Sequence, residues 1–518
     1  ARDAADPAVA DGDQDGRDEP WTPLFLSAST RLTTGNGDSP SGAGPGISAD
    51  GRFVVFESSA RDMAGGDGNG VSDVFLTDRE SGQVRRLSAT LRGRDGNGPS
   101  WQPRISADGS TVVFLSRATD LAPGGAGNGK ADILVATVAT GGLERVTALA
   151  VSDAADPSIS ADGSVVAFRT AERLLNSDTN GLSDVYVWLR ATGRFERVSQ
   201  TSSGGQGAAG SFDPAISGNG RYVVFRSSHS FAAGAPSGVS HVYLKDRQTG
   251  AVDWISRRPG AEGANAASFD PVISGDGAVV AFASDASNLV DGDGNRSADV
   301  FVLDRSAGRL TSPSAGAGIP GGAAAPAVSV DGRAVAFQGR SGTGTIAVPQ
   351  VFVALDGESP LLVSTGAGGQ AGNAASVRPA VSATGRTVAF RSLADNLVPG
   401  DVQGTSDVFA METGPVATGL AAQVSGRTVS LSWGGDAEAW DVYRSLLPGG
   451  PFAWLGTTTG TRFDDASGVS SDRAWFWVSG VTSRGVTNAS DGLEVVLPGT
   501  AQDSDGDGLS DAREVALG

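Results

Sequence analysis

The sequence predicts an all-β protein: a seven-bladed β-propeller, followed by a small β-sandwich. A phrase of the form Ile/Val-Ser-x-x-Gly occurs seven times, at Ile47, Ile105, Ile159, Ile216, Ile273, Val328 and Val381. Successive copies lie 58, 54, 57, 57, 55 and 53 residues apart. Short runs rich in β-branched and aromatic residues surround each copy, and none has helical periodicity. Such a period indicates one repeated supersecondary unit, which buries its apolar face against the next copy.

The sequence pattern within each repeat predicts four strands in a fixed order. A short strand that often contains proline leads into the phrase, as in DPSIS, and an apolar strand such as VVAFRT follows it. A third strand, such as DVYVWL, begins about 25 residues after the phrase. The fourth follows a turn of the type D-R-x-x-G, as in VRRLS. Seven repeats of four strands are typical of a seven-bladed propeller.

The two ends of the array predict how the ring closes. After the seventh phrase the pattern runs through DVFAMET and stops before its fourth strand. Residues 23–33, PLFLSASTRLT, match the end of a repeat but have no phrase before them. We expect this N-terminal strand to complete the last blade, which removes the open edges of the array. An open solenoid is the alternative.

The composition limits the function classes. The chain has 518 residues, no cysteine and a formal net charge of −19. Disulfides and thiol chemistry are therefore excluded, and so acidic a surface disfavours nucleic acid as a partner. No apolar run reaches the length of a membrane-spanning helix. The first residues, ARDAADP, look like the end left when a signal peptide is removed, which predicts an exported protein.

The repeats resemble a known family. The I-S-A-D-G phrase with its V-x-F strand, and the later D-V-F-x-x-D segment, resemble TolB-type, WD40-like (PD40) propeller repeats of bacterial exported proteins over about residues 23–413. The resemblance implies the fold and a location that is secreted, at the cell surface or periplasmic. It implies little about activity, because propellers serve as enzymes, receptors and scaffolds.

A different β pattern begins after residue 414. Runs such as TVSLSW, WDVYRS and AWFWVSGV predict a β-sandwich. Trp433 at the end of the second strand and the pair Trp475 and Trp477 give it a resemblance to a fibronectin type III domain, which implies a spacer or adhesive unit. Core packing is the expected role of these tryptophans and of Trp440 and Trp454, with a sugar-stacking platform as the alternative. The predicted segments are 1–22 (acidic), 23–414 (propeller), 415–498 (sandwich) and 499–518 (calcium-loop tail).

The tail carries the most specific local motif. DSDGDGLSDARE places oxygen ligands at positions 1, 3, 5, 7, 9 and 12 and a glycine at position 6, the order found in EF-hand loops around Ca²⁺. No entering helix precedes it, so it resembles thrombospondin type 3 and dockerin loops. A solvated acidic linker is the alternative. The predicted ligands are Asp503, Asp505, Asp507, the carbonyl group of Leu509, Asp511 and Glu514.

A polar triad, D-x-N/Q-x-x-x-D, recurs in the loops after the second strands. Three oxygen-bearing side chains over seven residues could hold Ca²⁺ together with backbone carbonyls and water. The favoured interpretation is structural: the middle residue forms an Asx turn and the last aspartate anchors the third strand. The candidate metal triads are Asp67, Asn69 and Asp73; Asp178, Asn180 and Asp184; and Asp293, Asn295 and Asp299, with a Gln-containing variant at Asp401, Gln403 and Asp407.

No catalytic constellation is apparent. The sequence has no G-x-S-x-G nucleophile elbow and only two histidines, His229 and His241. We therefore predict an exported, non-enzymatic, calcium-binding protein that takes a glycan, another ligand or a protein partner on the long-loop face, around the central channel. One alternative is a glycosidase or lyase, with Glu172, Asp285 and His229 as candidate residues. Another is a structural subunit of a surface layer or filament.

Overall fold

The computed structural model divides the chain into two compact units, and the larger comprises Pro23–Gly366 and Ala371–Met411. All regular secondary structure in the described ranges is β-strand. No helix in these ranges is long and apolar enough to cross a membrane. The structure describes residues 24–25, 44–65, 68–122, 129–147, 151–260, 262–315, 319, 322–340, 348–355, 357, 359–366, 370–398, 401, 405–412, 418–425, 428–434, 439–445, 453–465, 473–482, 485–489 and 493–496.

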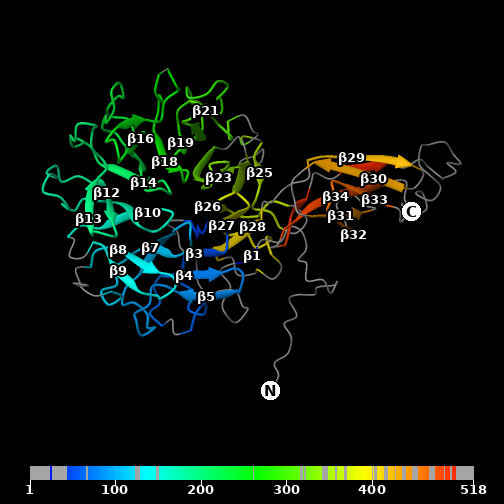
Figure 1. The fold of residues 1–518 in the computed structure, drawn as a ribbon, viewed down its shortest axis with the longest axis horizontal. Coiled ribbons are helices and arrows are strands. Elements are labelled where there is room, and N and C mark those ends of the chain that lie inside the picture. Colours follow the sequence, from blue (N-terminus) through cyan, green and yellow to red (C-terminus); the bar gives the residue numbers. More distant parts are fainter. Residues whose placement is uncertain are drawn as a thin grey trace. The chain divides into compact units, whose positions relative to one another are not determined.

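The larger unit consists of seven four-stranded antiparallel sheets, the blades, arranged around a common axis (Figure 1). In blade 1, β2 (Gly46–Ile47), β3 (Phe53–Ser58), β4 (Asp73–Asp78) and β5 (Gln83–Arg86) pair in chain order. Blades 2 to 6 repeat this order with β6 (Ser100–Ile105), β7 (Thr111–Ser116), β8 (Asp132–Thr137) and β9 (Leu143–Arg145); β10 (Ala154–Ile159), β11 (Val165–Thr170), β12 (Asp184–Leu189) and β13 (Arg194–Arg197); β14 (Ser211–Ile216), β15 (Tyr222–Ser227), β16 (His241–Asp246) and β17 (Val252–Trp254); β18 (Ser268–Ile273), β19 (Val279–Ser284), β20 (Asp299–Asp304) and β21 (Arg309–Thr311); and β22 (Ala323–Val328), β23 (Ala334–Arg340), β24 (Pro349–Leu355) and β25 (Leu361–Leu362).

Blade 7 combines the two ends of the propeller. It contains β26 (Ser376–Val381), β27 (Thr387–Ser392) and β28 (Asp407–Glu412), and its outermost strand is the N-terminal β1 (Leu24–Phe25). Leu24 pairs with Ala410 and Phe25 with Phe409 in antiparallel register. The predicted closure by an N-terminal strand is therefore confirmed, and the alternative of an open solenoid is wrong.

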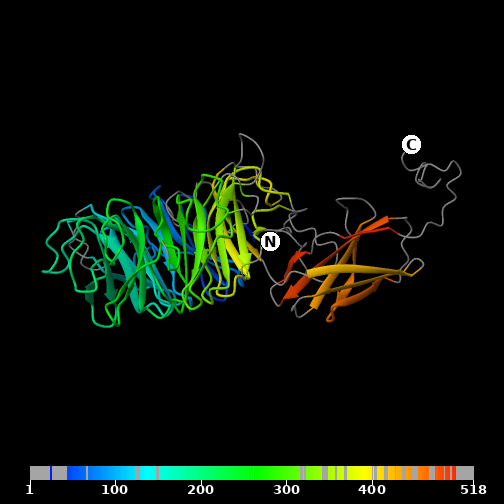
Figure 2. The ribbon, with the colours of Figure 1, turned by 90° about the horizontal axis from the view of Figure 1, so that it is seen from above.

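The core lies between neighbouring blades, which stand side by side in Figure 2. Each second and third strand is buried, and one aromatic residue from each forms a cross-strand pair in six blades. In blade 1, for example, the rings of Phe56 and Phe75 are 5.9 Å apart. The same blade packs against blade 7 through a cluster that includes Phe56, Phe75, Ala389 and Val408. Continuous burial around the ring stabilises all seven sheets together.

The smaller unit is a two-sheet β structure that includes Glu412–Gly518. One sheet contains β29 (Thr418–Ser425), β30 (Thr428–Gly434) and β33 (Arg462–Asp465). The other contains β31 (Ala439–Ser445), β32 (Ala453–Thr458), β34 (Arg473–Thr482), β35 (Gly485–Ala489) and β36 (Leu493–Val496). Both sheets contribute to one core, in which Trp433 and Trp440 make an edge-to-face pair with ring centroids 6.1 Å apart. Trp440 is 1 % exposed, so core packing is confirmed for this residue. The side chains of Trp454, Trp475 and Trp477 lie outside the described part of the structure.

Candidate binding site in the central channel

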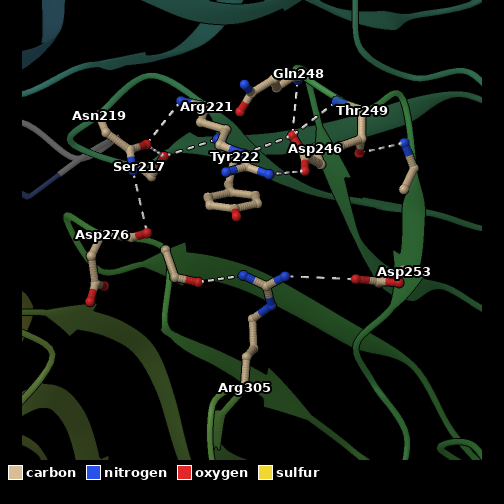
Figure 3. Close-up of polar contacts among 12 residues, drawn as sticks. Ser217, Asn219, Arg221, Tyr222, Asp246, Gln248, Thr249, Asp253, Asp276 and Arg305 are labelled. Atoms are coloured by element: carbon tan, nitrogen blue, oxygen red, sulfur yellow. Dashed lines mark hydrogen bonds and ion pairs between the residues drawn. The ribbon is translucent and has the colours of Figure 1, made fainter.

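The repeated phrase forms the turn between the first and second strands of each blade, shown for blade 4 in Figure 3. The hydroxyl of Ser217 accepts the N–H of Tyr222 at 3.0 Å and donates to Asn219 Oδ1 at 2.7 Å. Asn219 Oδ1 also accepts the N–H of Arg221 at 3.0 Å. Gly220 has φ +69°, a conformation that favours glycine. The phrase is therefore a self-contained turn, which explains its recurrence without a catalytic role.

These turns also join each blade to the next. Ala49 N–H donates to Ala107 O, Ala161 N–H to Gly218 O, and Ala383 N–H to Ala49 O across the junction of blades 7 and 1. The remaining junctions are bridged in the same way, from Asp108 to Ala161, Asn219 to Gly275, Gly275 to Val330 and Asp331 to Ala383. The turns approach closely, because a Cβ added at Gly218 would lie 3.0 Å from the Cα of Gly275. A closed ring of backbone hydrogen bonds thus surrounds the short-turn end of the channel.

The last residue of each candidate metal triad begins a third strand. Asp73, Asp184 and Asp299 are the first residues of β4, β12 and β20, and each is almost fully buried. Each carboxylate accepts a hydroxyl hydrogen bond from a serine that follows the fourth strand: Ser88 at 2.5 Å, Ser199 at 2.5 Å and Ser314 at 2.6 Å. The same hydroxyls accept the N–H of Val74, Val185 and Val300. These contacts anchor the third strand, as the structural interpretation expects.

The asparagines of the triads make local turns. The side-chain oxygens of Asn69, Asn180 and Asn295 each accept a backbone N–H two residues ahead. Asn69 Nδ2 donates to Asp73 Oδ2 at 3.2 Å and Asn295 Nδ2 to Asp299 Oδ2 at 2.7 Å. An N–H donor rather than a metal-ligating oxygen therefore faces these two carboxylates.

The first residues of the triads differ from one another. Asp67 lies outside the described residues, as does the loop of Asp503 to Glu514. Asp178 is buried and accepts from the hydroxyl of Tyr186 and from Gln206 Nε2. Burial and the neighbouring Asp299 raise the pKa of Asp293. Within the described ranges, no three His, Cys, Asp or Glu side chains converge in a way that could hold a metal ion. Calcium binding by the triads stays a prediction.

The first strand of each blade, here called the inner strand, lines the channel. An irregularity in these inner strands determines which side chains face the channel. In blade 3, Ala155 pairs with Arg169 and Ser158 with Ala167, so Asp156 and Pro157 together oppose one residue of β11. Such a bulge redirects a side chain, and proline fits it because it has no N–H to leave unpaired. The residue before this proline has a positive φ of 48–56° in six blades, namely Gln102, Asp156, Asp213, Asp270, Ala325 and Arg378. These six residues line a central cavity of 440 Å³.

Blade 1 has Gly44 at the corresponding position. A Cβ there would overlap the carbonyl oxygen of Arg378 and lie 2.8 Å from the Cβ of Arg378. Glycine is therefore required where blade 1 meets blade 7. The residue after the proline also lines the cavity, and in blade 2 it is Arg104. Each blade thus contributes two positions to the channel.

The charges in the channel are segregated around the ring. Blades 3, 4 and 5 present Asp156, Asp213 and Asp270, whereas blades 2 and 7 present Arg104 and Arg378. Asp156 forms an ion pair with Arg169 of its own blade, and Asp213 with Arg226. The ring of Phe212 lies 5.3 Å from the guanidinium of Arg169 and 4.9 Å from that of Arg226. These contacts hold the two aspartate–arginine pairs in place.

Arg104 and Asp270 of the channel have shifted pKa values. Burial, followed by repulsion from Arg378, lowers the pKa of Arg104. Burial raises the pKa of Asp270 against the opposing effect of Arg378. Behind the wall, burial raises the pKa of Glu57 to about 7, although its carboxylate accepts the N–H of Gln102 at 2.9 Å. Such shifts in one cavity are typical of functional sites.

The structure does not bring Glu172, Asp285 and His229 together in the channel. Glu172 accepts the N–H groups of Val151 and Ser152 at 2.8 and 3.1 Å, and Asp285 is exposed. His229 packs edge-on against Phe231, with ring centroids 4.7 Å apart.

His241 is fully buried at the first position of β16, where five other blades have aspartate. Its Nδ1 lies 3.3 Å from the hydroxyl of Ser256. Burial lowers the pKa of this imidazole. The contacts of both histidines are therefore structural.

The sequence-based prediction named the channel but none of its residues. The available signal was the residue before the proline that precedes each phrase: Gly, Gln, Asp, Asp, Asp, Ala and Arg in blades 1 to 7. Apart from Gly44, which close packing requires, variation at one position of an otherwise regular repeat marks a place where the fold does not dictate the side chain. Each blade therefore contributes its own charged or neutral side chain to the channel at this position.

No protein-family model and no curated protein matches this chain. Similar solved structures include an oligogalacturonate lyase from Vibrio parahaemolyticus, with 13 % identity over 77 % of this chain and 94 % of the other and a TM-score of 0.47. A protein assigned as TolB from Agrobacterium tumefaciens has 16 % identity over 52 % and 79 %, with a TM-score of 0.34. A prolyl endopeptidase has 12 % identity over 88 % and 55 %, with a TM-score of 0.45. At such identities the likeness concerns the fold alone: the chain is an all-β protein built on a seven-bladed β-propeller.

Proposed function

We propose that this chain is an exported, non-enzymatic binding protein that takes one ligand in the central channel of its propeller. The observation that carries the proposal is the set of bulges that turn six side chains into one cavity of 440 Å³. This volume lies in the usual range for small-molecule sites. The polar residues that recur in the blades form turns and anchor the third strands, and these roles account for their recurrence without a ligand. The channel site occurs once in the propeller, and its lining residues differ between blades. It is therefore suited to recognise a single ligand.

A channel-filling variant tests this proposal. Wild-type protein is incubated with a panel of glycans and glycoproteins, and bound ligand and released product are measured together. Ala327→Trp places a large ring in the cavity, because Ala327 lines it on β22. Leu91→Trp is the control, since Leu91 is 81 % exposed on a loop. Binding that is lost in the first variant and kept in the second supports the channel, whereas equal binding by both contradicts it.

A glycosidase or lyase is the second candidate, and the carboxyl groups of the channel are the observation that favours it. Asp270 lines the cavity with a raised pKa, and Glu57 behind the wall has a pKa of about 7. A carboxyl group with a raised pKa is suited to act as a general acid. Product released from any glycan of the panel, and lost in Asp270→Asn without loss of binding, would establish this function in place of the first.

We also propose that Ca²⁺ binds the C-terminal loop from Asp503 to Glu514. The ligand spacing of this loop supports the proposal, since it matches the order of an EF-hand loop. Calorimetric titration of the full chain with Ca²⁺ should show a site that disappears in Asp507→Ala. Asp293→Asn tests the blade triad in the same way. If both variants give the same heat of binding as the wild type, Ca²⁺ binds elsewhere. If the wild type gives no heat, Ca²⁺ binding is excluded.

A further inference from the structure

We infer that the channel selects a hydroxylated carboxylate, such as a sugar acid, whose carboxylate binds between Arg104 and Arg378. This inference rests on the proposed binding function and names the chemical class of its ligand. It follows from how the charged groups of the channel are paired. The other wall of the cavity supplies Asp270 as a partner for hydroxyl groups of the same ligand.

Only some of the described charged residues that line the channel have an ion-pair partner. Asp156 and Asp213 already have Arg169 and Arg226 as ion-pair partners. The lining charges left over are Arg104, Arg378 and Asp270. Among the described residues, no carboxylate lies within ion-pair distance of either lining arginine.

Backbone contacts hold the guanidinium group of Arg104. Its Nη1 donates to the carbonyl oxygens of Pro103 at 2.9 Å and Gly44 at 3.2 Å. These two backbone acceptors belong to neighbouring blades, and they fix the guanidinium against the wall. Its Nε and Nη2 make no hydrogen bond to the described residues. A planar guanidinium held in this way presents paired donors that match a carboxylate.

A second arginine lines the channel beside the first. Arg378 has the positive φ of the bulge, lines the same cavity and is exposed within it. Its charge is close enough to lower the pKa of Arg104 and that of Asp270. Two cations that repel one another destabilise the empty channel, and an anion between them relieves that repulsion. The pair therefore favours a negatively charged group over a neutral one.

In the described part of the chain, the opposite wall of the channel contains one carboxyl group without an ion-pair partner, that of Asp270. Burial raises the pKa of Asp270, and the nearby N–H of Ala325 opposes this effect. A carboxyl group in this position accepts hydrogen bonds from hydroxyl groups, and in its protonated form donates one. It repels a second carboxylate, which fixes the orientation of the ligand. The neighbouring lining residues Ala325 and Ala327 leave room for the body of the ligand.

The experiment compares glucuronate with glucose by calorimetry on the full chain. Glucuronate should bind at least tenfold more tightly than glucose, and more weakly as salt is added. Arg378→Gln should reduce the affinity for glucuronate at least tenfold and leave that for glucose unchanged. Arg92→Gln, at an exposed loop position, is the matched control and should bind as the wild type does. Arg104→Gln is a second test of the clamp, with thermal unfolding as the check on folding.

Equal affinities for the acid and the neutral sugar would overturn the inference, as would wild-type affinity in Arg378→Gln. A panel glycan that binds in the channel, is blocked by Ala327→Trp and is indifferent to both arginine variants would also overturn it. That last result would leave the proposed binding function intact. Failure of the wider panel to bind in the channel at all would remove the proposed function as well.

Discussion

Glu57 illustrates how one residue links the channel to folding. It lies on β3 directly behind the channel wall, is 5 % exposed, and receives a hydrogen bond from the N–H of Gln102 in the next blade. Burial raises the pKa of this carboxyl group to about 7, from an ordinary value of 4.5. The folded state therefore holds a proton that the unfolded state has released between these two pH values. Stability falls as the pH rises through this window.

Glu57→Gln should remove this dependence on pH. Glutamine keeps an oxygen that can accept the Gln102 N–H and carries no charge to desolvate. Relative to wild type, the variant should gain about 2–3 kcal/mol of unfolding free energy between pH 4.5 and pH 7.5, because one pKa unit corresponds to about 1.4 kcal/mol. Urea denaturation at the two pH values measures the difference. Glu80→Gln, at an exposed position, is the control. A constant difference across the window would show that Glu57 is ionised at both pH values.

At the scale of the element, the inner strand differs from the other three. Second and third strands such as β11 and β12 were predicted as VVAFRT and DVYVWL, because continuous runs of β-branched and aromatic residues identify buried strands. The bulge was not predictable in the same way. It requires a positive φ at Gln102, Ala325 or Arg378, which no local propensity of these residues favours. Only the pairing with the second strand reveals it.

The inner strand of blade 1 allows a direct test of close packing. Gly44→Ala should destabilise the propeller by about 2 kcal/mol or more, since the added Cβ overlaps the backbone of Arg378 in blade 7. Gly65→Ala is the matched control, because a Cβ there meets nothing within 4 Å. Thermal unfolding of both variants measures the effect. Equal melting temperatures would mean that the backbone at the junction of blades 1 and 7 shifts to accommodate the added Cβ without loss of stability.

For the whole molecule, the decisive feature is the closure of blade 7 by β1. The sequence predicted it because a fourth strand was missing at one end of the array and present at the other. The channel charges could not be predicted in that way, because they depend on which residues meet across the ring. Asp270 and Arg378, for example, are 108 residues apart yet line one cavity. Such proximity follows from closure and from no local pattern.

Breaking β1 should therefore weaken the entire propeller. Leu24 and Phe25 face Ala410 and Phe409, and alternate residues of an antiparallel pair donate to the ladder. Of the variants Leu24→Pro and Phe25→Pro, the one that removes a ladder N–H should lower the melting temperature more. It should also promote association through the freed edge of β28. Alanine at the same positions keeps the N–H and is the control. Melting and light scattering that are unchanged in both proline variants would contradict the role of β1 in closure.

The bulges separate the part of a blade that maintains the architecture from the part that contacts a ligand. The Ser-x-x-Gly turn recurs in every blade, and the cross-strand ring pair and the anchored third strand recur in most of them, whereas the residues on either side of the inner proline take part in none of these features. Outside blade 1, where Gly44 is required, substitutions at these flanking positions can therefore change the selectivity of the channel one sector at a time, while the scaffold tolerates them. Relatives of this chain with the same turns and different flanking residues would be expected to recognise different ligands.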